Sequence, residues 1–486
     1  MSQVNPVMSP LAAYFRHRDD RPYVRPWALA TPIAILMFCL PLLRPLHHPG
    51  QASLDEELRL ATISALVEHH PSLDDTLSGR LAIDTTSFPV RSHIFSVNNQ
   101  LYSDQPPMLA FILSGPYWIL HGLGYRLQDY SVFVPYLLTL LGVTLPAAGA
   151  AGLVYRMGKI FELRRELRAG LAAAVVFATG LISYSVVLNA HVPAAVLVLA
   201  SAGCLIHLAA SDTPWLGGGW LVLAGFCAAL AATIDLSAVI FLPLLAIVVP
   251  ALRLHPALRV GGVILYLLGA APPILLHSTL VANLTGDLLP GSFHPEFTVR
   301  HVRPFPEESE PPAELLTPSS DNPEPGDLGD DVELPPPSGL WQNIWRGTGR
   351  LITALLGEHG LLVHFPVVVL GFAGMFAVMH RHWPTTTKIL AADSAVAALA
   401  ALVVFAFSRY GLATAAFGNQ WLVVFLPLLF FWAGAWLRRA HHPAVWTAAA
   451  GLLVFSILVS LLGATDPMPR GGYDRYTPVA ALHNLR

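Results

Sequence analysis

The chain has 486 residues, of which 54% are hydrophobic and only 12% are charged. Soluble globular proteins carry roughly 25% charged residues, so this composition excludes that class and indicates a polytopic membrane protein. The net charge of −3 is too small to indicate a nucleic acid or an acidic partner. The three cysteines lie within apolar runs without CxxC spacing, which indicates neither a disulfide framework nor a cysteine-based zinc site.

The N-terminal segment, residues 1–26, is polar and directly precedes the first apolar stretch. Basic residues beside a membrane span stay in the cytoplasm, so this segment is predicted to be cytoplasmic and the first span, 27–46, to lead outward. The residues that carry this prediction are Arg16, Arg18, Arg21 and Arg25.

The loop that follows, residues 47–107, opens with a pattern typical of a helix start. Ser53 is followed three residues later by Glu56, ahead of an apolar series, which predicts a capping box and an amphipathic helix along the membrane surface. Asp55 and Glu56 fall in the first turn, where free backbone N–H groups favour negative charge. Capping, together with an Asp55–Arg59 pair, explains these carboxylates as well as a functional role does.

The same loop ends with Tyr102-Ser103-Asp104-Gln105-Pro106-Pro107, directly before an apolar stretch at 108–120. The prolines lack an N–H group, and the first of them disfavours helical geometry at Gln105. Asp104 is therefore expected on an extended segment at the start of a helix. Two acidic sites are predicted to face one membrane surface.

The stretch 108–120 is better explained as a re-entrant or interfacial helix than as a span. If it crossed the membrane, the next span would leave five basic residues between 156 and 168 outside. Its length is also short of the ~20 residues of a full span. The sequence then predicts eleven spans within a transmembrane domain at 27–463, with the tail 464–486 outside. The spans are 27–46, 132–155, 170–188, 191–210, 219–234, 236–252, 261–282, 361–379, 389–408, 418–437 and 443–463.

This topology gathers polar and ionisable residues on the outer face. Ionisable residues at a membrane edge are costly and are functional candidates by default, although each alone can equally be a solvated loop residue. Their convergence with Asp55 and Asp104 on one face is the stronger signal. The residues concerned are Asn189, His191, Asp235, Asn283, Asp287, His294 and Glu296.

The long outer loop, 283–350, divides into parts of different composition. Residues 292–305 mix aromatic, histidine and carboxylate side chains and are a candidate cover for the site. Residues 306–337 are rich in Pro, Glu, Asp and Ser, which predicts a disordered, extended segment. The stretch Trp341-Gln342-Asn343-Ile344-Trp345 is typical of an interfacial aromatic anchor.

An Asp-Glu pair shortly after the first span, then Tyr-x-x-x-Pro-Pro opening an apolar helix, resembles the first extracytoplasmic loop of the GT-C glycosyltransferases. These membrane enzymes use polyprenyl-phosphate sugars and include protein O-mannosyltransferases and lipid A aminoarabinose transferases. The resemblance is strongest over 54–120, with weaker similarities at 189–193, 292–296, 360–366 and 417–421. The family often has Lys before the double proline, where this chain has Gln105.

The resemblance implies an all-α, GT-C-like bundle with extracytoplasmic juxtamembrane helices, in a multi-pass protein of the cell membrane whose active site faces outward. It implies inverting transfer of a hexose or pentose from a polyprenyl-phosphate donor to a glycan, lipid or protein. Asp55 would then take the acceptor proton, and Glu56 would orient the acceptor or a divalent cation, the one cofactor that the resemblance suggests. The donor- or acceptor-binding candidates are Tyr102, Asp104, Gln105, His191, Asp235, His294 and Arg409.

Such a reaction also needs a cation to stabilise the departing phosphate. The sequence offers several and does not rank them: Arg59, Arg91, His93, Arg300, Arg303 and Arg409.

Other classes of function fit the sequence less well. It contains no HExxH, P-loop, Rossmann glycine pattern or EF-hand, which argues against a metalloprotease, an ATPase or a soluble nucleotide-sugar enzyme. A transporter or lipid flippase is the second hypothesis; it would need ionisable residues near helix centres, and these are scarce. The third hypothesis is a non-catalytic partner in a membrane assembly. Such a protein would keep its function when the acidic pair Asp55 and Glu56 is removed.

Overall fold

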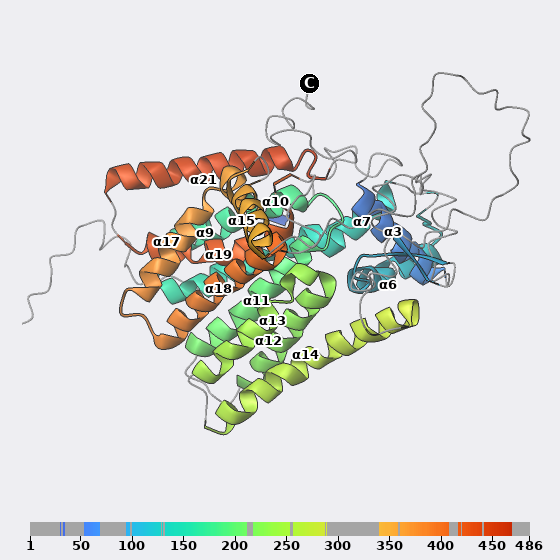
Figure 1. Cartoon of the computed structure of the whole chain (residues 1–486), viewed down its shortest axis with the longest axis horizontal. Coiled ribbons are helices and arrows are strands. Elements are labelled where there is room, and N and C mark those ends of the chain that lie inside the picture. The colour runs from blue at the N-terminus through green and yellow to red at the C-terminus, as the bar shows by residue number, and fades with distance from the viewer. Residues whose placement is uncertain are drawn as a thin grey trace, which may run out of the picture.

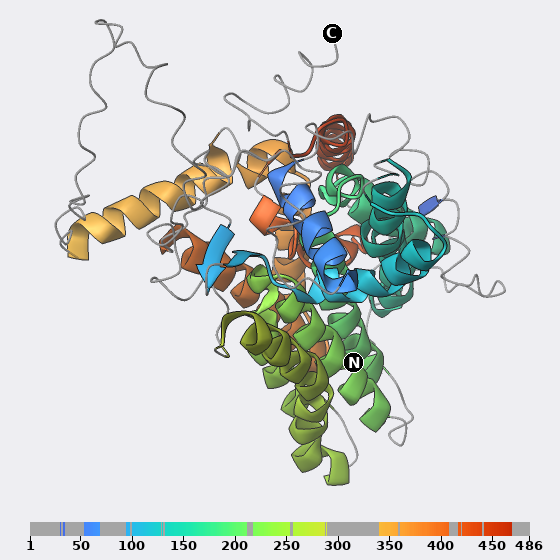
Figure 2. The ribbon, with the colours of Figure 1, turned by 90° about the vertical axis from the view of Figure 1, so that its right-hand side faces the viewer.

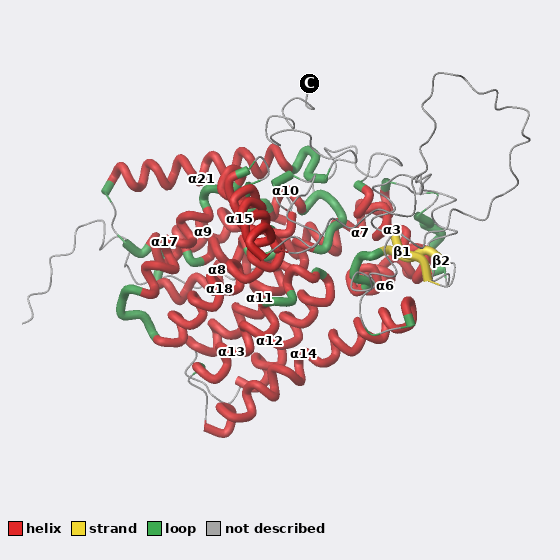
Figure 3. The backbone as a smooth tube through the Cα atoms, viewed as in Figure 1, coloured by secondary structure: helices red, strands yellow, loops and turns green. Residues whose placement is uncertain are grey.

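The computed structural model describes residues 53–68, 94–97, 100–127, 129, 132–210, 217–252, 256–286, 288, 340–357, 360–407, 417–418, 420–439 and 442–468, with 30, 33 and 34. The segment 1–26, nearly all of the first predicted span, the acidic stretch 306–337 and most of the tail lie outside these residues. Within them helices dominate, and the strands form a single two-stranded hairpin (Figure 3).

The first part of the fold is α3 (Leu54–Val67), the antiparallel hairpin of β1 (Ile94–Val97) and β2 (Gln100–Ser103), and α6 (Met108–Gly122). These elements lie together at one end of the molecule (Figure 1). At 15 residues, α6 is shorter than a full span. Its re-entrant or interfacial placement stays a prediction.

The start of α3 is capped as predicted, because Ser53 Oγ accepts a hydrogen bond from the Glu56 N–H at 3.2 Å. The helix differs from the prediction in its burial. Ten of its fourteen residues are buried, among them the charged Glu56, Glu57 and Arg59. The helix is thus enclosed by protein on more than an apolar face.

The remaining helices make up the rest of the fold, and most of them pack into a bundle (Figure 1). In chain order they are α7 (Phe133–Thr139), η2 (Leu140–Thr144), α8 (Leu145–Met157), η3 (Gly158–Phe161), α9 (Arg165–Phe177), α10 (Leu181–Tyr184), α11 (His191–Ala210), α12 (Gly217–Ile234), η5 (Leu236–Ala238), α13 (Phe241–Val248), η6 (Val249–Ala251), α14 (Pro256–Thr285), α15 (Leu340–Leu356), α16 (Leu361–His364), α17 (Val368–Met379), α18 (Thr385–Phe407), η9 (Gln420–Leu422), α19 (Leu426–Phe431), α20 (Ala433–Leu437) and α21 (Pro443–Gly463).

Within the described residues, six helices are long and apolar enough to cross a membrane, so the chain is a multi-pass membrane protein. They are Phe133–Phe161, His191–Ala209, Gly217–Ile234, Gly261–Asn283, Thr385–Val404 and Pro443–Gly463. The pair Gly347–His364 and Val368–Met379, bent by 93°, raises the count to seven if it is one span. The described residues do not confirm the predicted eleven.

Three predicted spans take a different form. The stretches 236–252 and 418–437 hold the shorter apolar helices Leu236–Ala251 and Leu426–Leu437. The stretch 170–188 is interrupted where α9 ends at Phe177 and Gly180 adopts a left-handed φ of 79°, a conformation that glycine accepts at little cost. Apolar composition continues across each of these breaks, so hydropathy does not mark them.

Helices α12 and α14 approach so closely that glycine is needed on both. A Cβ atom at Gly225 would lie 1.8 Å from the Tyr266 carbonyl oxygen, and one at Gly269 would lie 2.0 Å from the Val222 carbonyl oxygen. Small residues let membrane helices pack backbone to backbone in this way. The contact fixes the position of α12, whose C-terminal end leads directly into the site described below.

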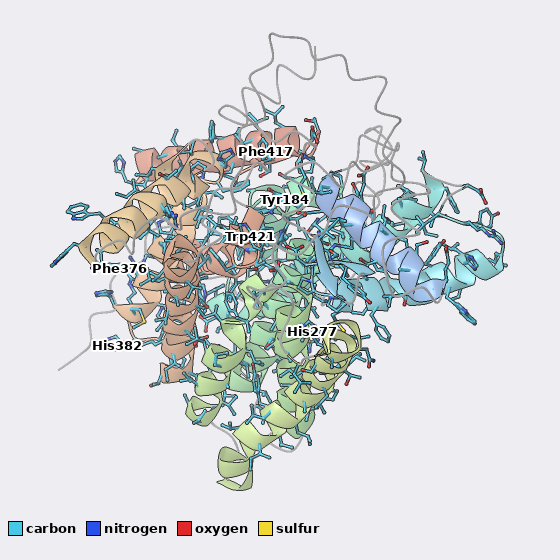
Figure 4. The ribbon with its side chains drawn as sticks, turned by 45° about the vertical axis from the view of Figure 1, so that its right-hand side comes forward. Tyr184, His277, Phe376, His382, Phe417 and Trp421 are labelled. Atoms are coloured by element: carbon cyan, nitrogen blue, oxygen red, sulfur yellow. The ribbon has the colours of Figure 1, made fainter. Side chains whose placement is uncertain are left out.

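The two ends of the bundle differ in chemistry. Tyr184, Phe417 and Trp421 lie together beside α3, whereas His382 lies at the opposite end (Figure 4). Basic side chains populate that opposite end: Arg438 Nη2 lies 2.6 Å from Glu162 Oε2, and its guanidinium stacks over Trp383. The end beside α3 therefore holds the aromatic residues Tyr184, Phe417 and Trp421, and the opposite end holds His382 and Arg438.

Candidate active site

The first group of the site is the carboxylate of Asp55, in the first turn of α3. Gln105 Nε2 donates to Asp55 Oδ1 at 3.1 Å and to the Asp55 backbone carbonyl at 3.2 Å. Gln105 is itself placed by the residues around it, since its N–H bonds Ser103 Oγ and Pro106 follows it. Asp55 is half-buried, so a substrate could still reach an oriented carboxylate.

Glu56 is fully buried next to Asp55 and has a different partner. Its Oε1 accepts the backbone N–H of Leu188 at 3.2 Å, which joins α3 to the segment before α11. This contact gives Glu56 a structural role that the capping-box pattern did not predict. The two adjacent carboxylates therefore have separate surroundings.

Among the candidate cations, Arg59 is the one that lies within the described residues. It lies one turn after Asp55, is buried, and its Nε and Nη1 have no hydrogen-bond partner among the described residues. Burial lowers the pKa of its guanidinium, and three carboxylates oppose that shift: those of Asp55, Asp235 and Asp104. Arginine keeps its charge under such conditions, so a buried positive group with unused N–H donors lies among the carboxylates.

His191 and Asp235 form a buried pair at the ends of two neighbouring helices. His191 is the first residue of α11, Asp235 follows the last residue of α12, and His191 Nδ1 lies 2.5 Å from Asp235 Oδ2. Asp235 Oδ1 accepts hydrogen bonds from the Ser237 N–H and hydroxyl. Burial raises the pKa of Asp235, but His191 and Ser237 outweigh it and hold the pKa below its ordinary value.

Three of the sequence stretches with weaker family similarity meet at this end. Trp421 stands T-shaped against the His191 ring, with centroids 5.3 Å apart. His364 stands in the same way against Phe417, at 5.2 Å. The Tyr184 hydroxyl donates to the Phe417 carbonyl oxygen at 2.7 Å, and Figure 4 shows Tyr184, Phe417 and Trp421 grouped beside α3. The stretches 189–193, 360–366 and 417–421 are thus brought together although they are far apart in sequence.

The other predicted site residues have mixed outcomes. Tyr102 is buried in β2, and Asp104 lies within the electrostatic range of Arg59. Asn189 is occupied by backbone, since its Nδ2 donates to the Tyr184 and Val187 carbonyl oxygens and its Oδ1 accepts the Val192 N–H. Asn283 is exposed near the end of α14. Asp287, His294, Glu296 and Arg409 lie outside the described residues, as do Arg91, His93, Arg300 and Arg303.

Two features of the described residues were not apparent from the sequence. Arg59 stands out only through its burial, because its sequence context is that of an ordinary helical ion pair. Asp393 is buried inside α18, and its Oδ2 has no hydrogen-bond partner among the described residues. No three His, Cys, Asp or Glu side chains in the described part of the chain are placed to share a metal ion.

Chemically, the site combines three functions. Asp55 can accept a proton, Arg59 can bind an anion through unused N–H groups, and His191 presents an imidazole whose orientation is fixed by a carboxylate. This combination suits a reaction in which a hydroxyl loses a proton while an anionic group departs.

Comparison with known proteins gives two similar solved structures, whereas no family model and no curated protein matches the sequence. ArnT from Cupriavidus metallidurans, solved bound to undecaprenyl phosphate, is 17% identical over 88% of this chain and 62% of that one, with a TM-score of 0.46. The Archaeoglobus fulgidus oligosaccharyltransferase, in the apo form, is 10% identical over 91% of this chain and 56% of that one, with a TM-score of 0.48. This chain spans less than two thirds of the length of each. Similarity of this degree assigns neither a reaction nor a substrate.

Proposed function

We propose that this chain is an inverting membrane glycosyltransferase that moves a sugar from a polyprenyl-phosphate donor to an acceptor on the extracytoplasmic side. The observation that carries the proposal is the half-buried Asp55, held by Gln105 within electrostatic range of the buried Arg59. A base for the acceptor hydroxyl and a cation for the departing phosphate are the two groups that this transfer needs.

In the proposed reaction, Asp55 takes the proton of the acceptor hydroxyl while that oxygen attacks the anomeric carbon from the face opposite the phosphate. A single displacement of this kind inverts the configuration of the anomeric carbon. Gln105 keeps one oxygen of Asp55 engaged at 3.1 Å, which orients the other toward the acceptor. Proton removal by a positioned carboxylate accelerates such reactions by about 10²–10⁴-fold.

Arg59 is proposed to bind the donor phosphate. A guanidinium offers several N–H donors in one plane and suits phosphate oxygens, and its low hydration lessens the cost of burial. Its Nε and Nη1 are buried and have no hydrogen-bond partner among the described residues. Tyr102, Asp104, His294 and Arg409 stay proposals for donor or acceptor binding.

The proposed topology places the site outside, in a chain of eleven spans in the cell membrane. It is supported by basic groups at one end of the bundle, where His382 lies (Figure 4) and the Arg438 guanidinium stacks over the adjacent Trp383. Basic residues concentrate on the cytoplasmic side of membrane proteins. The end that holds Tyr184 and Trp421 would then face the extracytoplasmic space, where a lipid-linked sugar is used.

Mass spectrometry of lipid extracts from a deletion strain tests the function and identifies the sugar at the same time. The strain should accumulate a glycosylated polyprenyl monophosphate, which is cleared by the wild-type gene but not by one encoding Asp55→Asn. The matched control is Glu166→Gln, which replaces an exposed carboxylate at the start of α9. A gene encoding this variant should clear the accumulated lipid. An unchanged set of lipid-linked sugars in the deletion strain would refute the proposal.

A second candidate, transport or flipping of a lipid, is favoured by Asp393, a carboxylate buried within a spanning helix. The two functions respond differently to substitution. A transporter would lose function on Asp393→Asn and tolerate Asp55→Asn, whereas the transferase predicts the reverse. The same lipid extracts distinguish the two.

A further inference from the structure

Asp235 is a carboxylate whose two oxygens are both engaged by protein groups. Oδ1 accepts the Ser237 N–H at 2.9 Å and the Ser237 hydroxyl at 2.7 Å, and Oδ2 lies 2.5 Å from His191 Nδ1. Only 2% of the Asp235 side chain is exposed. These contacts are those of a residue that orients a neighbour, rather than of one that binds substrate.

The residue that Asp235 orients is His191, which uses only one of its two ring nitrogens in this contact. Nδ1 is bound to Asp235, and the ring packs edge-on against Trp421. No described residue bonds the other ring nitrogen, Nε2. A carboxylate on Nδ1 fixes the orientation of the imidazole, and in an imidazolium both ring nitrogens, Nε2 included, are hydrogen-bond donors.

The His191 imidazole and the Arg59 guanidinium share the field of one carboxylate. Asp235 contacts His191 directly and is one of the three carboxylates that act on Arg59. Two nitrogen groups, the Arg59 guanidinium and the His191 imidazole, therefore lie near Asp235, and Asp55 precedes Arg59 by one turn of α3 with Gln105 against it. In a transfer reaction, the two nitrogen groups suit the group that leaves and Asp55 suits the group that attacks.

We infer that His191 is a further catalytic residue of the proposed transfer, whose Nε2–H donates a hydrogen bond to the phosphate oxygen that leaves the anomeric carbon. Asp235 is then the positioning residue for His191. The inference rests on the proposed function and adds to it the group that stabilises the leaving oxygen.

The step balances without a further reactant. A bond forms between the acceptor oxygen and the anomeric carbon, the bond from that carbon to the phosphate oxygen breaks, and its electron pair stays on the phosphate. The acceptor proton passes to Asp55. The phosphate thereby gains a charge, changing from a diester with one negative charge to a monoester that carries up to two, and the Nε2–H group of His191 meets that added charge.

This role predicts a difference in affinity between two lipids that differ by one methyl group and the charge that this group removes. Undecaprenyl phosphate has the phosphate monoester that the reaction releases. Its methyl ester is a diester with a single negative charge, as in the donor. Binding of each can be measured by titration calorimetry on the full chain in nanodiscs. His191→Gln should raise the Kd of undecaprenyl phosphate about tenfold and the Kd of the methyl ester no more than about twofold. A hydrogen bond between charged groups is lost only with undecaprenyl phosphate.

Two further variants separate catalysis from structure. His207→Gln is the matched control, since His207 lies on the same helix and packs T-shaped against Trp220 at 4.7 Å; it should bind both lipids like wild type. Ser237→Ala removes one hydrogen bond to Asp235 while keeping the His191 ring. It should reduce the preference for undecaprenyl phosphate over the methyl ester, but by less than His191→Gln does. Because Ser237→Ala keeps both His191 and Asp235, it tests the inference even if His191→Gln fails to fold.

The outcomes also distinguish this inference from the proposed function. Equal weakening of both lipids by His191→Gln would overturn the inference, because it would leave only a structural role, and the proposed function would stand. Wild-type affinity of His191→Gln for undecaprenyl phosphate would do the same. Failure of the wild-type protein to bind either lipid would overturn the proposed function and the inference with it.

Discussion

Gln105 occupies the position next to the base, with its Nε2 3.1 Å from Asp55 Oδ1. Replacing it with glutamate would put two carboxylates within hydrogen-bond distance, where both cannot readily carry charge. Gln105→Glu should therefore raise the apparent pKa of the base, lower transfer at neutral pH and restore part of it in alkaline buffer. The pH–rate profile checks this, and a profile identical to that of wild type would exclude Asp55 as the titrating base.

Asp235 should make the protein sensitive to acid. Its pKa in the folded protein lies below the ordinary value of 3.8, so its charged form stabilises the fold. That stability is fully present above about pH 4, which is near the pKa of the unfolded chain, and is lost as the pH falls through the lower folded value. Thermal unfolding in detergent between pH 6 and pH 2.5 measures it. Asp235→Asn should lower stability at pH 6 and show a smaller further loss on acidification; an equal acid-induced loss in both proteins would contradict this.

Individual residues of the site could be predicted only where their signal is local. Ser53 and Glu56 lie three residues apart, and the cap they predict is present. The actual partner of the Glu56 carboxylate, the N–H of Leu188, is 132 residues away, and no pattern within α3 indicates it. Arg59 could not be ranked among the cations for the same reason, since its burial depends on segments distant in sequence.

At the scale of elements, α15 has an apolar face that the rest of the described protein leaves uncovered. Trp341, Trp345, Ile352 and Leu356 fall on one side of the helix and are each more than half exposed, and Arg350 is exposed on the other. The segment Gly347–His364 lies at 93° to Val368–Met379. Figure 2 shows α21 end-on and α15 extending sideways from the bundle. This geometry favours a helix lying in the membrane interface, as the aromatic pattern predicts.

Spin labels on α15 in nanodiscs test this placement. A label at Ile352 should be relaxed strongly by oxygen dissolved in the lipid and weakly by a water-soluble nickel complex. A label at Arg350, on the opposite side, should show the reverse and is the matched control. Equal access of the nickel complex to both positions would show that this face of α15 is in water.

Helix ends and breaks show where prediction of elements fails. Long apolar helices such as α11 and α21 match their predicted spans closely, because composition alone defines them. The break at Gly180 depends on one backbone angle and on the fit of Phe365 against that glycine. Neither is visible in hydropathy, so a span was predicted where two short helices stand.

For the whole molecule, the predicted orientation follows from charge. Glu166 lies exposed at the start of α9, at the basic end of the bundle, which the topology places in the cytoplasm. Glu166→Cys, in a chain whose native cysteines are replaced, should be protected from an impermeant thiol reagent in intact cells and react after permeabilisation. Labelling from outside would overturn the re-entrant or interfacial assignment of α6, since α6 would then count as a span.

The most direct measurement of the central claim is turnover by the purified protein in nanodiscs, with the polyprenyl-phosphate sugar that accumulates in the deletion strain as donor. Asp55→Asn keeps the size of the side chain and an oxygen to accept the Gln105 N–H, but removes the base. It should reduce turnover by at least about 10²-fold with unchanged thermal stability. Glu166→Gln should match wild type, and Glu56→Gln should lose less, because its amide oxygen can still accept the Leu188 N–H. Turnover by a folded Asp55→Asn protein within a few-fold of wild type would contradict the account.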